Sequence, residues 1–256
     1  MSEASDLLVA ASVAARAAQA LLRDARPDRV KSKSNPRDLV TEWDVKSEEL
    51  IRRVLEEHAP GIPVVGEEGG GEPTSGLHWL VDPIDGTVNF AHGLPLWCVS
   101  IAAARGNDVL AGVVVCPLLD WWFEASAGGG ARDGNGPLAV SRIDRLDQAL
   151  LGTGFPYDMT GENNLDRWSH LMRTAGSCRR LGSAAIDLCL LAKGAFDGHW
   201  ENRLQAWDLA AGVLIIREAG GTVTNMTGGP FDLNVGEVLA SNGAIHAELI
   251  AELARA

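Results

Sequence analysis

The chain has 256 residues, 46% of them apolar, and a formal net charge of −12 at pH 7. This is ample apolar sequence for a sizeable core, and an α/β chain of this length often folds as one unit. The negative charge argues against a general affinity for nucleic acid or anionic membranes, so neither partner is expected. An anionic substrate remains compatible with it, because a bound cation can invert the local field.

Two helices are predicted at the start of the chain. Residues 5–23 have apolar side chains at helical spacing, and a second helix is predicted to follow Thr41 and to run to about His58. Asp44, three residues after Thr41, completes a weak analogue of a capping box. The N-terminus lacks the features of a secretory signal, and the apolar stretches are judged too short to span a bilayer. A soluble, cytoplasmic protein is therefore expected.

From Gly61 the pattern changes to strands separated by glycine-rich turns, and Asn135-Gly136 is a hairpin signal. The second half alternates helix and strand. Strands are predicted over residues 62–65, 78–82, 97–104, 109–116, 121–125, 222–225 and 237–240, and helices over 183–193, 208–219 and 243–255. This order is typical of a layered α/β protein. If there are two lobes, the boundary is expected near residues 140–150.

The cysteines and histidines offer no separate metal or nucleophile site. The four cysteines match neither a zinc pattern nor a CxxC pair, which fits free thiols in a reducing cytosol. The six histidines have no ligand-spaced partner, so surface or structural roles are expected, with His92 a candidate for the site entrance. Arg179 and Arg180 precede the substrate segment and could support the phosphate indirectly, but a place at the surface or at a dimer contact is expected.

The most informative segment covers residues 79–87, in which an apolar strand ends in two carboxylates. Asp82 comes at the end of the strand, Pro83 halts the hydrogen-bond ladder, and Asp85 follows. Two carboxylates at the mouth of a strand can share a hard cation such as Mg²⁺, which prefers oxygen ligands. Gly86 lets the backbone approach a ligand, and the amides after it can meet phosphate if a helix begins there. In isolation, the same two acids can simply shape a turn.

Three further acidic segments change this interpretation. Glu67 and Glu68 end another apolar run, Asp208 stands at the start of a predicted helix, and Asp44 lies in an acidic segment beside Thr41. Each has a structural explanation of its own, because adjacent acids are usually solvated and a first-turn acid can cap a helix. Since the four segments occur together and in order, a shared metal site explains them better.

These ordered motifs resemble the inositol monophosphatase family, within the lithium-sensitive, magnesium-dependent phosphatase superfamily. The resemblance covers nearly the whole chain and rests on residues 33–41, Gly66-Glu67-Glu68, Asp82-Pro83-Ile84-Asp85-Gly86-Thr87, Gly182-Ser183-Ala184-Ala185 and Trp207-Asp208-Leu209-Ala210-Ala211-Gly212. It implies a five-layered αβαβα sandwich of the inositol monophosphatase and fructose-1,6-bisphosphatase type. A single domain over residues 1–256 is implied, with an N-terminal lobe over about 1–145, a C-terminal lobe over about 146–256, and assembly as a homodimer.

The same resemblance implies the roles of individual residues. The implied ligands of two to three Mg²⁺ ions are Glu67, Asp82, the Ile84 backbone carbonyl, Asp85 and Asp208. The implied catalytic residues are Glu67 and Thr87, which orient the attacking water, and Asp44, which supports Thr87. The implied substrate contacts are Asp85, Gly86, Thr87, Ala184, Glu201 and Asp208, of which Ala184 and Glu201 touch the alcohol part.

The predicted function is that of a magnesium-dependent phosphomonoester hydrolase in which a metal-activated water attacks phosphorus directly. The expected reaction converts inositol-1-phosphate to myo-inositol and phosphate, with inhibition by lithium implied by the resemblance. Asn202, Arg203 and Gln205 leave the substrate open, and histidinol phosphate, a sugar phosphate or a nucleotide 3′-phosphate are the alternatives. A role as an interaction protein of the transcription machinery is also compatible with the family.

Overall fold

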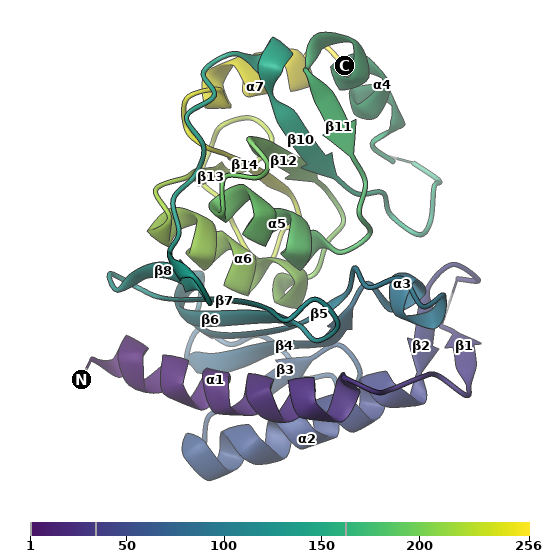
Figure 1. The fold of residues 1–256 in the computed structure, drawn as a ribbon, viewed down its shortest axis with the longest axis vertical. Helices are drawn as coiled ribbons and strands as arrows, with labels where there is room; N and C mark the ends of the chain where they lie inside the picture. The colour runs from purple at the N-terminus through teal and green to yellow at the C-terminus, as the bar shows by residue number, and fades with distance from the viewer. Residues whose placement is uncertain (1, 34, 162) are drawn as a thin grey trace.

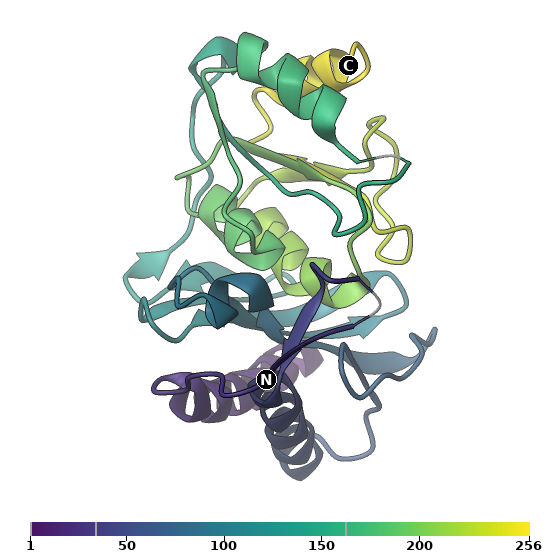
Figure 2. The same cartoon turned by 90° about the vertical axis from the view of Figure 1, so that its right-hand side faces the viewer.

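Helices and sheets alternate in five layers along the long axis of the molecule (Figure 1). The computed structural model describes residues 2–33, 35–161 and 163–256. The layers are α1 (Glu3–Leu22) with α2 (Glu42–His58), a seven-stranded sheet, α5 (Ala184–Ala192) with α6 (Ala206–Glu218), a five-stranded sheet, and α4 (Leu165–Thr174) with α7 (His246–Leu253). Figure 2 shows the same layers from the side. The predicted five-layered αβαβα sandwich is confirmed.

The seven-stranded sheet is built from the strand-rich middle of the chain. Its strands, in sheet order, are β3 (Val64–Gly66), β4 (Leu77–Asp85), β5 (Cys98–Arg105), β6 (Asp108–Cys116), β7 (Trp121–Ser126), β8 (Gly130–Asp133) and β9 (Gly136–Pro137). Only the β3–β4 pair is parallel within this described sheet. Strands β4 to β6 are buried along most of their length, because helices cover both faces.

The five-stranded sheet lies in the second half of the chain and is mixed. Its order is β11 (Ser177–Arg179), β10 (Leu150–Thr153), β12 (Gly198–Glu201), β14 (Val238–Ser241) and β13 (Thr222–Thr224). A 3₁₀ turn, η1 (Leu146–Gln148), precedes β10. Strands β10, β11 and β12, of three or four residues each, were not predicted from the sequence, although β13 and β14 of the same sheet were. Helix α4 was not predicted either.

Helices α5 and α6 form the central layer and are packed on by both sheets. Both are apolar around most of their circumference, as expected for a helix without a solvent face. The packing is close: a Cβ at Gly212 would lie 2.6 Å from Leu188 Cβ, and one at Gly112 on β6 would lie 2.9 Å from Ala211 Cα. These small residues bring the start of α6 down onto the first sheet, and this is where the two halves of the site meet.

Helix α1 covers the outer face of the first sheet, and its length bears on the expectation that no apolar stretch could span a bilayer. By length and composition alone it could cross a membrane, so the judgement that every apolar stretch is too short was wrong. In this fold α1 packs instead against β5, β6 and α2. The residues of its buried face are Ala4, Leu7, Ala10, Ala11, Ala14, Ala15, Ala18 and Leu22.

Helix α2 begins where the sequence predicted it, after a short ribbon of β1 (Val30–Ser32) and β2 (Leu39–Thr41). The Thr41 side chain caps the first turn, and the Asp44 carboxylate accepts a hydrogen bond from the Thr41 backbone, which completes the capping box. This cap orients Asp44 toward the end of β4, where the candidate site begins.

Candidate metal and phosphate site

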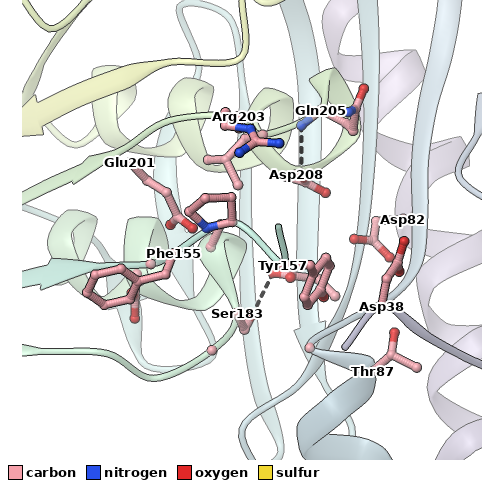
Figure 3. Close-up of a pocket in the computed structure, with 18 of the residues that line it drawn as sticks. Asp38, Asp82, Thr87, Phe155, Tyr157, Ser183, Glu201, Arg203, Gln205 and Asp208 are labelled. Carbon is pink, nitrogen blue, oxygen red and sulfur yellow. Dashed lines mark hydrogen bonds between the residues drawn. The ribbon is translucent and has the colours of Figure 1, made fainter. Parts of the chain in front are cut away.

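The predicted site residues gather at one cavity of about 420 Å³, between the end of β4 and the starts of α5 and α6 (Figure 3). Residues from both halves of the chain line it. The lining includes every predicted site residue except Asp44, namely Glu67, Asp82, Ile84, Asp85, Gly86, Thr87, Ala184, Glu201 and Asp208. Residues more than a hundred positions apart thus share one polar cavity.

The end of β4 brings two carboxylates to this cavity. The prediction that Pro83 halts the strand at Asp82 was wrong, because β4 continues to Asp85. Its pairing with β5 shifts register between Asp82 and Asp85, so the ladder skips Pro83 and resumes at Asp85. Asp82 Oδ1 accepts a hydrogen bond from the Ile84 amide at 3.0 Å. Asp82 is 2% exposed, so its carboxylate has little access to water beyond the cavity.

Gly86 makes the turn from β4 into the short helix α3 (Thr87–Ala91). Its φ is +94°, and an added Cβ would lie 3.1 Å from the carbonyl oxygens of both Leu96 and Gly182. Both the left-handed backbone and the close approach require glycine here. A helix does begin after Gly86, which was the condition stated for its amides to meet phosphate.

Asp44 lies behind Thr87 rather than in the cavity. Thr87 Oγ1 is 3.2 Å from Asp44 Oδ1 and 3.0 Å from the Ile84 carbonyl oxygen. Burial raises the pKa of Asp44 to about 6, although hydrogen bonds from Thr41 act in the opposite direction. The predicted contact between Asp44 and Thr87 is present, and it orients the threonine hydroxyl at the wall of the cavity.

Asp85 joins the two halves of the chain. Its Oδ2 accepts hydrogen bonds from the Ser183 hydroxyl at 2.6 Å and the Ala185 amide at 2.8 Å, both at the start of α5. Ser183 also caps α5, since its Oγ accepts from the Ile186 amide. The segment beginning at Gly182 was predicted to contact substrate. The hydrogen bond from Ser183 to the Asp85 carboxylate, 98 positions away in the chain, was not predicted.

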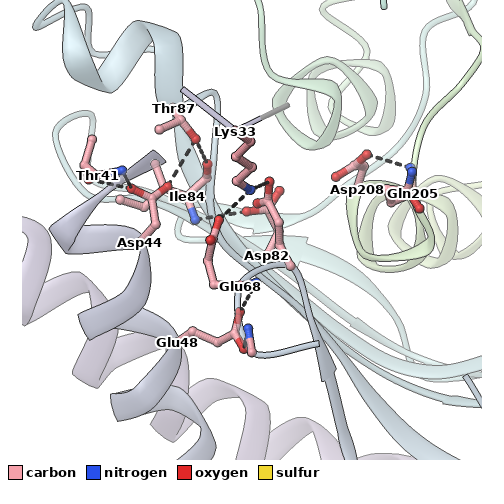
Figure 4. Close-up of polar contacts among 12 residues, drawn as sticks. Lys33, Thr41, Asp44, Glu48, Glu68, Asp82, Ile84, Thr87, Gln205 and Asp208 are labelled. Atoms are coloured by element: carbon pink, nitrogen blue, oxygen red, sulfur yellow. Dashed lines mark hydrogen bonds and ion pairs between the residues drawn. The ribbon is translucent and has the colours of Figure 1, made fainter. Parts of the chain in front are cut away.

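Glu67 pairs with Lys33, a residue to which no role was assigned from the sequence. Lys33 Nζ lies 2.8 Å from Glu67 Oε1 and 2.7 Å from Glu68 Oε1 (Figure 4). Burial alone would lower the pKa of Lys33, but these ion pairs raise it above its usual range. Its ammonium group thus offsets part of the negative charge of Glu67 and Glu68.

The loop that carries Glu67 is anchored from α2. Glu48, which is 2% exposed, accepts hydrogen bonds from the amides of Glu68 and Gly69, both at 2.8 Å. Arg52 pairs with the same Glu48 carboxylate and donates to the Val64 carbonyl. These bonds fix the turn after β3, so the position of Glu67 does not depend on the Lys33 contact alone.

Asp208 reaches the cavity from the first turn of α6. Its Oδ2 accepts a hydrogen bond from the Gln205 amide at 2.8 Å, and the two residues form a capping box. Both interpretations of Asp208 in the sequence analysis therefore describe the same residue: it caps the helix and lines the cavity.

The cavity holds more negative charge than its surroundings compensate. Burial and then the neighbouring carboxylates raise the pKa of Asp82 and Asp208 well above the usual range. Burial also raises the pKa of Asp85 to about 6, against the hydrogen bonds from Ser183 and Ala185. Carboxylates that repel one another in a buried site are stabilised by a bound cation.

The donor set fits a hard divalent cation. It consists of carboxylate oxygens and the Ile84 carbonyl, and Mg²⁺ prefers oxygen ligands of these kinds. In the described ranges no three His, Cys, Asp or Glu side chains have closed to ligand spacing.

Several lining residues come from segments that the sequence analysis left without a role. The loop after β10 contributes Phe155 and Tyr157, and Arg203 comes from the turn after β12. No motif marks these positions. Arg180 lines the cavity as well, rather than only the surface, whereas His92 lines a neighbouring groove.

Comparisons with known proteins identify the family of the chain. The model of the inositol monophosphatase family matches residues 3–256. Phosphatase IMPL1 of Arabidopsis thaliana is 43% identical over 229 residues, which are 86% of this chain and 62% of that protein, so the chain spans less than two thirds of its length. An inositol-1-monophosphatase of Synechocystis is 41% identical over 229 residues, covering 88% and 80% of the two chains.

A solved structure extends the likeness to the whole fold. The inositol monophosphatase of Anabaena superposes with a TM-score of 0.90 at 36% identity, over 99% of this chain and 97% of that one. The acidic cavity, the layered fold and these relatives lead to one conclusion. The chain belongs to the inositol monophosphatase family.

Proposed function

We propose that this protein is a magnesium-dependent phosphatase that hydrolyses inositol-1-phosphate to myo-inositol and phosphate. The observation that carries the proposal is the convergence of Glu67, Asp82, Asp85 and Asp208 on one cavity, with Thr87 at its wall. The family of the chain supports the same reaction class.

The proposed metal ligands are the four carboxylates and the backbone carbonyl of Ile84, which together would hold two to three Mg²⁺ ions. When bound, the ions supply Lewis-acid charge for the phosphoryl oxygens and acidify water. The four carboxylates would also offset the positive charge of the ions once the phosphate leaves.

The chain's own groups would position the reactants. The Thr87 hydroxyl donates a hydrogen bond to Asp44, which leaves an oxygen lone pair of Thr87 to accept a hydrogen bond from the attacking water. Glu67 would receive the second hydrogen bond of that water. The amides of Gly86 and Thr87 would donate to the phosphate, and Ala184 would contact the alcohol part.

The reaction and its substrate can be tested with one panel. Purified protein would be assayed against inositol-1-phosphate, histidinol phosphate, a sugar phosphate and a nucleotide 3′-phosphate, each with Mg²⁺ and with EDTA. The proposal expects Mg²⁺-dependent turnover and the highest kcat/KM on inositol-1-phosphate. A higher kcat/KM on another ester would retain the chemistry and replace the substrate, and no phosphate release on any ester would overturn the proposal.

Glu201 is proposed to select the alcohol rather than to cleave the phosphate. It lines the same cavity as the metal-site carboxylates and is buried at the end of β12. Hydrogen bonds to a charged group are worth about 1.5–3 kcal/mol, so Glu201→Gln should lower kcat/KM for inositol-1-phosphate roughly ten- to a hundredfold. The measurement is steady-state kinetics on this substrate and on a small aryl phosphate without hydroxyls.

The aryl phosphate is the matched control for Glu201→Gln, and its kcat/KM should barely change. Equal losses on both substrates would place Glu201 with the metal ligands instead. If neither substrate were affected, Glu201 would have no part in recognition.

Lithium should inhibit at millimolar-scale concentrations. The expectation comes from the family, and the site supports it because a small hard cation can occupy an oxygen-ligand position without supplying the same charge. The measurement is the initial rate during a lithium titration with total monovalent salt held constant by sodium. An unchanged rate would argue against this site resembling its relatives.

The proposed setting is a homodimer in the cytoplasm. The four cysteines are free and buried, as suits a reducing compartment. A groove of about 420 Å³ beside the active cavity has a largely apolar lining that includes Leu39, Val88 and Leu165, which supports an interface nearby. Light scattering of the purified protein would give the oligomeric state.

A further inference from the structure

A buried histidine lies behind the alcohol end of the cavity. His199 is fully buried in the middle of β12, and Glu201 is two residues further on. Alternate residues of a strand point to the same face, so the two side chains are neighbours. The parallel pairing of β10 with β12 sets His199 beside Gly152, and Asp187 approaches from α5.

The His199 ring lies between two carboxylates. Its Nε2 is 3.4 Å from Glu201 Oε2, and its Nδ1 is 3.7 Å from Asp187 Oδ2. Both separations exceed an ordinary hydrogen bond. Among the described residues, neither nitrogen of the His199 ring has a hydrogen-bond partner, and the Asp187 Oδ1 atom has none either. Because buried polar groups are rarely left unpaired, this cluster is arranged for contacts that a small movement would complete.

Two shared protons would satisfy both contacts. In one form the imidazolium donates to both carboxylates, and in the other a protonated Asp187 donates to Nδ1 while Nε2–H donates to Glu201. The two forms differ only in the position of one proton. Burial raises the pKa of Asp187 well above its usual range, which is consistent with the second form. Either way, one oxygen of Glu201 accepts a hydrogen bond from the His199 ring.

Two glycines on and after β10 make room for this arrangement. A Cβ at Gly154 would lie 1.8 Å from Glu201 Oε1, and a Cβ at Gly152 would lie 3.2 Å from His199 Nδ1. Any larger residue at position 154 would push the carboxylate out of its place. The backbone of β10 thus sets the space in which Glu201 can lie.

We propose that His199, supported by Asp187, is a positioning residue that holds the Glu201 carboxylate for the hydroxyl groups of a polyol phosphate. The proposal rests on the proposed role of Glu201. The two contacts shorten when the alcohol part enters the cavity, since such contacts are often long before substrate binds. Glu201 Oε2 is then held by the ring, and Oε1 receives the substrate hydroxyl.

The test compares two replacements of His199. His199→Phe fills the space but removes both nitrogens, so kcat/KM for inositol-1-phosphate should fall roughly tenfold, as expected for losing a charge-assisted hydrogen bond. Turnover of the aryl phosphate should stay within about twofold, which is ordinary for a change away from the reacting atoms. His199→Gln keeps a donor near the Nε2 position and should recover most of the loss, whereas His199→Asn, whose amide is nearer Nδ1, should not.

Epistasis with Glu201 separates positioning from packing. If His199 acts through Glu201, the double variant H199F/E201Q should lose no more than E201Q alone on inositol-1-phosphate. Gly154→Ala should reproduce the E201Q substrate pattern without changing any ionisable group. His246→Phe, at another buried histidine that contacts Ser241 and Thr224, is the matched control and should leave the substrate ratio unchanged.

The outcomes distinguish this inference from the proposed function. If another ester proves to be the best substrate, the same ratios are measured with that ester. If E201Q itself leaves the ratio unchanged, the role of Glu201 fails and the inference falls with it. If E201Q shifts the ratio but His199→Phe does not, or if the two losses add fully, the inference alone is overturned. Should His199→Phe fold poorly, the Gln and Asn variants decide: the inference expects a higher kcat/KM for inositol-1-phosphate in His199→Gln than in His199→Asn, and the reverse order would overturn it.

Discussion

Asp85→Asn is expected to reduce magnesium-dependent turnover by roughly a hundredfold or more, since loss of a ligand should exceed the ten- to hundredfold cost typical of residues that only support one. Asp85 lies at the point where the two halves of the cavity meet, and it is partly buried. Removing its charge weakens binding of the cation, which is the proposed counter-charge of the phosphate. The measurement is kcat and kcat/KM across a Mg²⁺ titration.

The fold should survive this substitution. An Asn Oδ1 atom can still accept the hydrogen bonds that Ser183 and Ala185 donate to Asp85. Circular dichroism and a thermal melt in EDTA would check this. Asp147→Asn is the matched control, because it removes one carboxylate charge from an exposed pair with Arg145. Turnover close to wild type in Asp85→Asn at saturating Mg²⁺ would refute the proposed site.

Without metal, the free energy of unfolding should fall as pH rises from about 4 to about 6. The pKa values of Asp44 and Asp85 are raised to about 6 in the folded protein, from an ordinary value of 3.8. Between these values the folded chain binds more protons than the unfolded chain, and stability then decreases with pH. Each group contributes at most about 3 kcal/mol to this loss, and the raised pKa values of Asp82 and Asp208 act in the same direction.

Mg²⁺ should counter this loss because it binds the ionised carboxylates. Its stabilising effect should therefore grow as pH rises through 6, and should reach about 2.7 kcal/mol when the free ion is at one hundred times its dissociation constant. The measurement is urea unfolding at several pH values, in EDTA and in Mg²⁺. A stabilisation independent of pH would show that the cation does not bind these acids.

The Asp85→Asn variant provides a control for the same measurement. In EDTA above pH 6 it should be more stable than the wild type, since one repelling charge is gone. In Mg²⁺ the difference in free energy of unfolding between this variant and the wild type should shrink or change sign. A variant that is less stable than wild type in EDTA throughout this pH range would mean that Asp85 stabilises the fold rather than straining it.

Much of the site could be predicted because its signals are local. Asp82, Asp85 and Gly86 lie within five residues, and their order reports a strand end followed by a left-handed turn, which the structure has. The capping spacing of Thr41 and Asp44 likewise needs no distant partner. The short strands β10 and β12 were not predicted, since three or four residues carry little periodicity, whereas β13 and β14, equally short, were predicted.

The sequence by itself determined which acids are available, where the first two helices and the central strands of the first sheet lie, and which family the chain resembles. Those features depend on side-chain periodicity, caps and motif order. Only the tertiary structure decided which side chains meet across the layers. Ser183 holds Asp85, Lys33 holds Glu67, and His199 lies between Asp187 and Glu201. These contacts depend on how the α5 and α6 layer docks between the two sheets, and that docking is set by close packing of residues far apart in the chain.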